Sequence, residues 1–319
     1  MANSLAFQQK NIVIRLLGGL GNQLFQLTFG SLLANISNAD LFLDSSLLCD
    51  HTHGRHLVNR SLKLSILANL YPEIDLHTRL RNNCFGCSWP VRGYSKMLRA
   101  FAPIRSIHES SLFDSVSSTS IFLQSHPSIA SFCFFEGCWQ YIQDYPQYDR
   151  LIKQTMLFNP SLLAAIHNAS NTADIDYDCA VAVHVRRSDY LFEENQAHIV
   201  CLEPDYYQSA NYKIQALLQS RDLNYFVFSD DLEWCRSNLA FLSDRVNFVE
   251  KPASLSIDSD VFDFLFMSLF KNYIIPNSTF SLWAAYLSRN RGKRIIAPSR
   301  WFHGHNGPPS IGVGYLDLI

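Results

Sequence analysis

The clearest candidates for chemistry are a histidine, two adjacent arginines and an aspartate that follow one short apolar run. The run covers residues 180–183, and His184, Arg186, Arg187 and Asp189 come after it, which predicts a buried strand with these side chains at its carboxyl end. Two neighbouring guanidinium groups favour an anion between them, because their planar forks match phosphate oxygens in bidentate pairs. The segment therefore predicts a diphosphate site. The alternative is a strand end at the surface whose arginines pair with local carboxylates.

A glycine-rich turn near the start of the chain is a second candidate site. Residues 18–21 fit the first two glycines of a dinucleotide-binding fingerprint, although Leu24 occupies the place of the third. Asp44 ends the next apolar run, where it could bind a ribose, so an NAD-dependent oxidoreductase is one class that the sequence leaves open. Asn22 and Gln23 favour another ligand, since their amides suit sugar hydroxyls or a phosphate. The alternative for Asn22 is a helix cap.

Three further polar segments stand where a predicted strand gives way to a helix. The acids of residues 229–231 can hold a ribose or a base, or cap the next helix. Residues 277–281 carry more hydroxyl and amide donors than a helix cap needs, which indicates a phosphate. Asp258 and Asp260 have the spacing of a metal–diphosphate site, but two acids just before a helix favour capping.

The composition argues against several classes of partner. The chain has 319 residues, 48% of them hydrophobic, and a formal net charge of -2, so no field of one sign favours nucleic acid or an anionic membrane. No apolar run reaches the ~18 residues of a membrane span, and the polar start of the chain predicts no secretory signal. Of the 8 cysteines, only Cys84 and Cys87 have the gap of a metal or redox pair, and no second pair completes a zinc site. We expect reduced, structural thiols.

The elements that must position these residues follow an alternating pattern of strands and helices. The pattern indicates an α/β fold with two domains, over residues 1–172 and 173–319, and the polar stretch 168–178 is interpreted as the linker. In the second domain the alternation predicts a doubly wound sheet with ligands at the carboxyl ends of its strands. Expected strands cover residues 12–17, 41–43, 121–124, 132–135, 180–185, 225–228, 246–249, 273–275 and 294–297, and expected helices cover 22–36, 203–220, 260–270 and 279–288.

Taken in their order along the chain, these segments resemble the α-1,2-fucosyltransferases of glycosyltransferase family 11. Each segment is modest alone, but the ordered set is specific and spans residues 12–302. The segments are GGLGNQLFQ at 18–26, HVRRSDY at 184–190, FSDD at 228–231 and NSTFSLW at 277–283, with GCWQ at 137–140 and APSRWF at 297–302 as lesser landmarks.

The resemblance implies a GT-B-like fold, in which two Rossmann-like domains face a central cleft, the first on the acceptor side and the second binding the donor. It implies transfer of L-fucose from GDP-β-L-fucose to O2 of a terminal galactose in a glycan, with inversion at C1 and without a metal or other cofactor. The residues implied on the donor side are His184, Arg186, Arg187, Gly19, Asn22, Ser229, Asp230, Asp231, Asn277, Ser278, Thr279, Phe280 and Ser281.

The resemblance also implies catalytic roles. Arg186 would stabilise the charge that grows on the β-phosphate, and Asn22 would reach the same site from the first domain. Related α-1,6-fucosyltransferases place a glutamate ten positions after the motif histidine, and here that position is Glu194. His198 and Asp189 are rivals for the role of base, and Asp189 could instead orient the arginines.

Departures from the family pattern are mild, and they leave the donor site intact and the acceptor open. Transfer to another position, as in the α-1,6 enzymes, and a non-catalytic glycan-binding module are alternatives beside the oxidoreductase. Because no membrane anchor is visible, we expect a bacterial cytoplasmic enzyme, at most peripheral to the inner membrane. The departures are Ser188, Leu27, Ala284 and Cys138, where members often have Gly, Tyr, Gly and Tyr.

Overall fold

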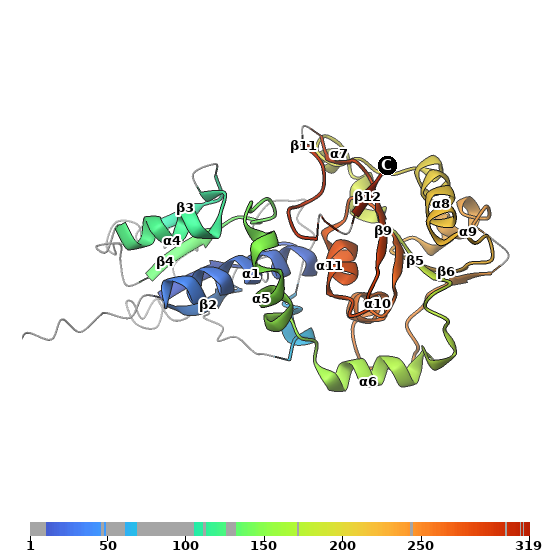
Figure 1. Ribbon diagram of the computed structural model, residues 1–319, viewed down its shortest axis with the longest axis horizontal. Coiled ribbons are helices and arrows are strands. Elements are labelled where there is room, and N and C mark those ends of the chain that lie inside the picture. The colour runs from blue at the N-terminus through green and yellow to red at the C-terminus, as the bar shows by residue number, and fades with distance from the viewer. Residues whose placement is uncertain are drawn as a thin grey trace, which may run out of the picture. The chain divides into compact units, whose positions relative to one another are not determined.

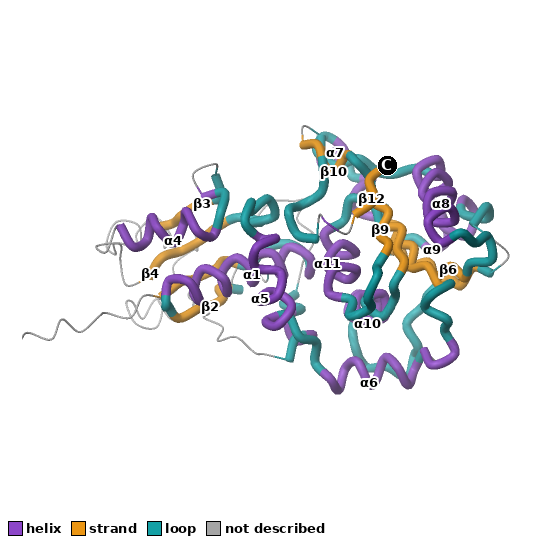
Figure 2. The backbone as a smooth tube through the Cα atoms, in the orientation of Figure 1, coloured by secondary structure: helices purple, strands orange, loops and turns teal. Residues whose placement is uncertain are grey.

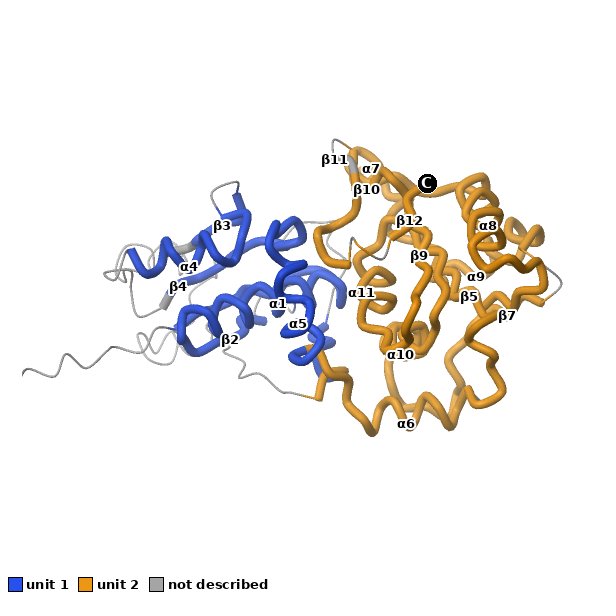
Figure 3. Tube along the Cα trace, in the orientation of Figure 1, with its two compact units in different colours: residues 1–65, 69–155 blue, residues 66–68, 156–319 orange. Residues whose placement is uncertain are grey.

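The chain folds into two compact units (Figure 3). The first comprises residues 1–65 and 69–155, and the second comprises residues 66–68 and 156–319. The structure is a computed structural model and describes residues 11–45, 48, 61–68, 105–110, 113–125, 132–170, 172–242, 245–303, 305–312, 314 and 316–319.

The division between the units lies at residues 155/156, earlier than the expected boundary at 172/173. Helix α6 (Pro160–Ala169) belongs to the second unit because it packs on α10 (Ser259–Met267) of that unit. The polar stretch 168–178, interpreted from the sequence as the linker, therefore lies inside the second unit.

The first unit contains a four-stranded parallel sheet in the order β2-β1-β4-β3. Helix α1 packs against β1 and β2, and α4 lies against α1 (Figure 1). The strands are β1 (Asn11–Arg15), β2 (Asp40–Asp44), β3 (Arg105–His108) and β4 (Phe132–Glu136), and the helices are α1 (Leu20–Ser37), η1 (Leu64–Ile66, in the sequence at the unit boundary), α4 (Val116–Ser125), η3 (Tyr145–Tyr148) and α5 (Asp149–Thr155).

The expected strand at residues 121–124 is wrong, because these residues form the second half of α4. Val116, Thr119 and Leu123 are buried at helical spacing. The first turn of α4 is capped from a distance, since the carboxylate of Asp144 accepts hydrogen bonds from the backbone N–H groups of Val116 (2.9 Å) and Ser117 (3.0 Å). An apolar run this short fits either element, and the capping partner is remote in sequence.

The second unit contains a six-stranded parallel sheet in the order β12-β9-β8-β5-β6-β7 (Figure 2). The strands expected after residue 178 are confirmed, with ends shifted by at most a few residues. The strands are β5 (Ala180–Val185), β6 (Asn224–Ser229), β7 (Val246–Phe248), β8 (Asn272–Ile274), β9 (Arg294–Ala297) and β12 (Leu316–Leu318), with an antiparallel pair of β10 (Arg300–Phe302) and β11 (His305–Asn306). The remaining helices are η4 (Thr172–Asp174), η5 (Ser188–Leu191), α7 (Glu193–Gln196), α8 (Pro204–Leu218), α9 (Leu232–Asn238) and α11 (Thr279–Leu287).

The strand order places a topological switch point between β5 and β8. From β5 the chain builds β6 and β7 on one side, and it then returns to build β8, β9 and β12 on the other. This is the strand order of the doubly wound dinucleotide-binding fold. Loops that leave β5 and β8 therefore diverge, and ligands bind such sheets in the crevice at that point.

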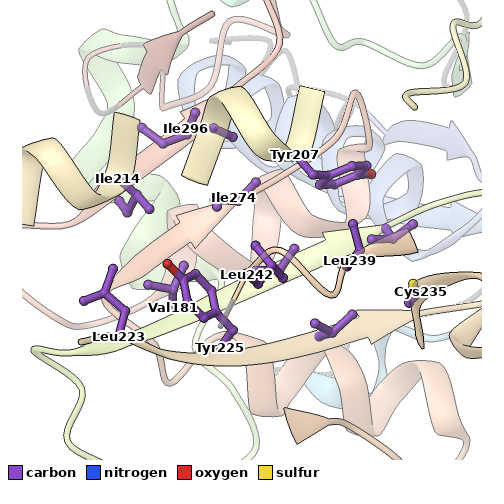
Figure 4. Close-up of a cluster of buried hydrophobic side chains, with 14 residues drawn as sticks. Val181, Tyr207, Ile214, Leu223, Tyr225, Cys235, Leu239, Leu242, Ile274 and Ile296 are labelled. Carbon is purple, nitrogen blue, oxygen red and sulfur yellow. The ribbon is translucent and has the colours of Figure 1, made fainter. Parts of the chain in front are cut away.

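Alternation along β5 gives its two faces different partners. Val181, Val183 and Val185 join a buried cluster with side chains of α8 and α9 (Figure 4). His184 points to the opposite face, where its ring contacts Phe280 of α11 at 5.5 Å. The core on the first face thus fixes a strand that presents a polar side chain on the other.

Gly30 of α1 tests the packing of the first unit. A Cβ atom there would lie 2.4 Å from Cγ1 of Ile14 and 2.9 Å from Cδ1 of Leu41. Alanine normally stabilises a helix interior by ~1 kcal/mol over glycine, but overpacking costs about 1–3 kcal/mol. We expect Gly30→Ala to lower the thermal and urea midpoints of unfolding, whereas Gly314→Ala, where the added Cβ meets open space, should not. A more stable Gly30→Ala protein would contradict this packing.

Candidate functional site

The segments that follow β5, β6 and β8 are brought together by strand register. Val185 lies opposite Ser229 of β6, and Val183 lies opposite Ile274 of β8. Because the strands are parallel, their carboxyl ends meet at one edge of the sheet. The three motifs that the sequence singles out in the second half of the chain therefore stand at the switch point.

Arg186 is held between two carboxylates at this edge. Its Nε and Nη2 atoms lie 2.9 and 2.8 Å from Oδ1 of Asp189, and its Nη1 lies 2.9 Å from Oδ2 of Asp230. Burial alone would lower the pKa of the guanidinium, but Asp230 and Asp189 outweigh it and hold this pKa above its usual value. Three of the five N–H donors of an arginine are engaged in this way, so each terminal nitrogen keeps a second N–H.

Arg187 has different partners. Its guanidinium carbon lies 4.0 Å from the centre of the Trp234 ring, and Glu203 and Asp231 lie 3.6 and 3.8 Å from its nitrogens. Its backbone N–H donates to Oδ1 of Asp230 at 2.9 Å. The structure therefore directs Arg187 onto Trp234 and away from the partners of Arg186, and the two guanidinium groups do not form the joint clamp that the sequence predicts.

His184 is a neutral side chain within the sheet. It is 5% exposed, and burial, with a smaller contribution from the charge of Arg186, lowers the pKa of its imidazole to about 3. Its Nδ1 atom has no hydrogen-bond partner among the described residues. A buried neutral ring with an open nitrogen is suited to a polar contact with a ligand rather than to proton transfer at neutral pH.

A series of aromatic contacts supports the ring of His184. Phe280 packs on it, Phe264 of α10 contacts Phe280 at 5.2 Å, and Phe158 contacts Phe264 at 6.0 Å. Phe158 in turn forms an antiparallel bridge with Leu67. The imidazole is thus fixed by packing from α11, α10 and the segment before α6.

Residues 277–281 lie between β8 and α11, and their side chains have unequal roles. Asn277 is 1% exposed, and its Nδ2 donates to the backbone oxygens of Val200 (3.0 Å) and Trp301 (2.9 Å). Ser281 is fully buried with its Oγ toward Ser278 O at 3.4 Å. Ser278 stands at the N-cap position of α11, and Thr279 begins the helix. The amide nitrogen of Asn277 is thus committed within the protein, and so is Ser278, whose N–H donates to Pro276 O at 2.7 Å and whose side chain hydrogen-bonds with Tyr190. What is left of the predicted phosphate site is the start of α11 at Thr279.

The acids that follow β6 are also committed within the protein. Asp231 caps α9, since its Oδ1 accepts a hydrogen bond from Trp234 N at 3.0 Å. Asp230 accepts from Arg187 N and pairs with Arg186. Ser229 Oγ accepts from Asp231 N at 2.9 Å. This segment fixes the arginines and the helix start, and its carboxylates have partners without a ribose or a base.

The three candidate bases lie on the segment between β5 and α8. Asp189 contacts Arg186, whereas Glu194 in α7 and His198 after it are exposed. Asn195 Nδ2 donates to Asp189 O at 2.6 Å, and His303 N donates to His198 O at 2.8 Å. The segment is thus tied to the edge of the sheet while two of its candidate bases face solvent.

Asp263 is a titratable residue that the sequence motifs miss. Burial, with a smaller contribution from Asp260, raises the pKa of its carboxyl to about 7. It lies on α10 beside Phe264 in the sequence, and within the described part of the chain no hydrogen bond or ion pair joins it to Arg186 or His184. An acid inside the otherwise apolar run 261–267 is the signal that could have found it.

The glycine turn of the first unit is held by amide side chains, of which Gln23 is buried and Asn22 half-buried. Helix α1 begins at Leu20 with Gly19 at its N-cap, so Asn22 lies in the first turn and is not the cap. Asn22 Oδ1 accepts from Gln140 Nε2 at 3.1 Å. The Gln23 amide donates to Gly18 O and Ser61 O and accepts from Lys63 N at 3.0–3.1 Å, so it holds the backbone and does not bind a sugar.

Asp44, the acid that would bind the ribose in the dinucleotide-binding alternative, already has a partner within the protein. Asp44 is fully buried, and its Oδ2 lies 3.0 Å from Nε of Arg15. A ribose at this strand end would therefore meet a carboxylate that is already paired.

Of the two pairs of residues with the spacing of a metal site, the structure describes the aspartates but not the cysteines. Asp258 occupies the N-cap position of α10 without a capping hydrogen bond from its side chain, and Asp260 Oδ1 accepts from Val261 N at 2.9 Å, so the capping expected of this pair is met by position alone. Cys84 and Cys87 lie outside the described residues. Within the described part of the chain, no three His, Cys, Asp or Glu side chains gather to hold a metal ion. Independence from metal stays a prediction.

A parallel sheet of this order, with helices between its strands, places the protein in the class of doubly wound α/β proteins. Residues 107–303, more than half of the chain, match the model of glycosyl transferase family 11. The chain belongs to that family. It is therefore a glycosyltransferase, as the sequence segments predict.

Two proteins of Escherichia coli are similar to this chain over most of their length. An α-1,2-colitosyltransferase is 29% identical over 299 residues, which are 91% of this chain and 92% of the relative. The O-antigen biosynthesis glycosyltransferase WbnK is 26% identical over 310 residues, which are 91% of this chain and 94% of the relative.

Solved fucosyltransferases share the fold. The NodZ α-1,6-fucosyltransferase, soaked with GDP-fucose, is 16% identical with a TM-score of 0.53 over 88% of this chain and 92% of its own. POFUT1 in complex with GDP-fucose is 12% identical with a TM-score of 0.52 over 91% and 98%. The expected GT-B-like fold class is confirmed. No helix among the described residues is long and apolar enough to cross a membrane.

The raised pKa of Asp263 predicts a pH-dependent stability. The folded protein holds the proton of this carboxyl up to about pH 7, whereas the ordinary value is 3.8. Between these values the folded state binds more protons than the unfolded chain, so stability falls as pH rises, and above about pH 7 the loss is complete. We expect Asp263→Asn to have a Tm that changes less between pH 4 and 7 and exceeds that of the wild type at pH 8.

Thermal unfolding from pH 4 to 8 checks this prediction. Asp222, an exposed partner of Arg245 in the same unit, provides the control, because Asp222→Asn should leave the pH profile of the Tm unchanged. An Asp263→Asn profile parallel to that of the wild type would show that this carboxyl has an ordinary pKa.

Proposed function

We propose that the protein transfers L-fucose from GDP-β-L-fucose to O2 of a terminal galactose in a glycan, forming an α-1,2 linkage with inversion at C1. The observation that carries the proposal is Arg186, fixed at the switch point of a doubly wound sheet in a family 11 chain. The α-1,2 linkage is supported by the name of the colitosyltransferase relative. The donor is supported by the GDP-fucose complexes that share the fold.

The proposed reaction separates a diphosphate from an oxocarbenium-like sugar. Galactose O2 attacks fucose C1 on the face opposite GDP, and negative charge grows on the β-phosphate oxygens. Arg186 has an N–H left on each terminal nitrogen to donate to those oxygens, and the start of α11 at Thr279 would supply further donors. These groups do the work that a metal does in other transferases, so we propose that the reaction needs none.

The other site residues fall into supporting roles. The contacts of Asp189 and Asp230 with Arg186 support a role in orienting the guanidinium. His184 offers Nδ1 to the donor. Asn22 and Gly19 of the first unit are proposed on the donor side by the resemblance alone.

A colitosyl donor is the second candidate. Colitose is the 3-deoxy form of L-fucose, so the two GDP-sugars differ by one hydroxyl, and the relative with 29% identity is a colitosyltransferase. Arg186 would bind either diphosphate. Parallel assays with GDP-fucose and GDP-colitose, using lactose as acceptor, decide between them.

Arg186→Lys tests the anion site. Lysine keeps the charge but loses the planar fork, and removing one preorganised donor to a developing oxyanion costs roughly 100-fold or more in kcat. We expect a loss of this size in transfer, and GDP should no longer raise the Tm. Arg236, which pairs with Glu250 on the same unit, supplies the control Arg236→Lys with normal transfer.

A thermal-shift screen of the wild type with GDP, UDP and NAD(H) accompanies this assay, since specific binding raises the Tm. Protection by GDP alone is the expected result. Protection by NAD(H) alone, or normal transfer by Arg186→Lys, would overturn the assignment. Transfer that persists in EDTA is expected, and its loss would contradict the metal-free mechanism.

Glu194→Gln tests the base. A positioned general base contributes typically 100-fold or more to the rate, so we expect kcat to fall by about this factor while the KM for the donor is unchanged. Glu193 stands beside it on α7 and is also exposed, so Glu193→Gln is the matched control. An unchanged kcat for Glu194→Gln, with a loss for His198→Gln, would move the base to His198.

A further inference from the structure

We propose that Asn277 is a positioning residue, which fixes the segment of residues 188–201 to the end of β8 and so sets the place of the candidate bases. This role deepens the proposed transfer and rests on it for the meaning of the kinetic readouts. It replaces the direct phosphate contact that the sequence predicts for this residue.

Asn277 contacts the segment near both of its ends. Its Nδ2 donates to Val200 O at 3.0 Å, and its own backbone oxygen accepts from the hydroxyl of Tyr190 at 2.9 Å. The second Nδ2 bond, to Trp301 O at 2.9 Å, joins β10 to the same point. One buried residue therefore links the strand end, both ends of the segment and β10.

The amide of Asn277 has no donor left for an anion. A primary amide carries two N–H groups, and both carbonyl partners lie within hydrogen-bond distance. With the residue 1% exposed, a phosphate could reach this nitrogen only if one of the two backbone oxygens lost its partner. The geometry is that of a structural tie.

The segment depends on such ties because it buries little apolar surface. Leu191 and Phe192 are 42% and 49% exposed, and residues 193, 194 and 196–198 are exposed as well. Segments with few buried contacts open at low free-energy cost unless hydrogen bonds hold them. The Asn277 bonds lie at its two ends, and Asp189, Glu194 and His198 lie between or beside them.

Asn272 provides a closely matched control at the other end of β8. It is fully buried, and its Nδ2 donates to the backbone oxygens of Tyr177, Asp178 and Ala180 at 3.0–3.3 Å. Its Oδ1, like that of Asn277, has no partner among the described residues. The two asparagines thus share burial and bonding, and they differ in what they hold.

The test compares Asn277→Asp with Asn272→Asp in the full chain. Both changes keep the shape and remove the donors, so both should lower the Tm. Only Asn277→Asp should speed hydrogen exchange in peptides of residues 188–200, measured by mass spectrometry at a temperature where both variants are folded. It should also lower kcat by about ten-fold or more, because misplacing a catalytic group by ~1 Å can cost ~100-fold.

Tyr190→Phe keeps the test valid if the asparagine variants do not fold. It removes the hydroxyl and with it the bond to Asn277 O and the contact with the Ser278 side chain, both at the end of β8. It should speed exchange at the start of the same segment while the rest of the unit is unchanged. Equal exchange of residues 188–200 in wild type, Asn277→Asp and Tyr190→Phe, or equal kinetic losses for Asn272→Asp, would overturn the proposal. Hydrogen exchange needs no substrate. If the wild type transferred no fucose, the proposed function would be refuted, but the exchange data would still decide whether Asn277 fixes residues 188–200.

Discussion

The candidate site of this protein depends on one ion-pair arrangement, in which Arg186 is held between Asp189 and Asp230. A guanidinium placed at the end of a strand has several rotamers, and a carboxylate on each side leaves it few. Asp230 also accepts from the backbone of Arg187, so the same carboxylate joins the ends of β5 and β6. The same carboxylate therefore fixes both the orientation of the Arg186 guanidinium and the alignment of the ends of β5 and β6.

Much of the second unit could be predicted from the sequence because its signals are local. β5, β6 and β9 are short apolar runs bounded by polar residues, and buried parallel strands have this form. In the first unit, α4 could not be predicted because its cap, Asp144, is 28 residues away from Val116 in the sequence. The strand order, which creates the switch point, follows from pairings that no local pattern encodes.

The candidate site shows the same limit at the level of single residues. Arg186 could be placed from its position after a strand, but the contact of Arg187 with Trp234 joins residues 47 positions apart. Asn277 and Gln23 attract notice as hydrogen-bonding side chains, and the structure gives their amides to the backbone of distant segments. An amide in a sequence motif thus indicates that bonds are made, while only the fold tells whether the partner is a ligand or the chain.

The aromatic series below His184 has a mechanical consequence. Phe158 lies at the bridge with Leu67, where the chain passes between the two units, and Phe264 and Phe280 connect it ring by ring to the imidazole. Close-packed rings leave little slack. The position of the imidazole therefore depends on the segment just before α6 as well as on its own strand, and a cavity opened at Phe158 or Phe264 would loosen the support of a ring that neither residue touches.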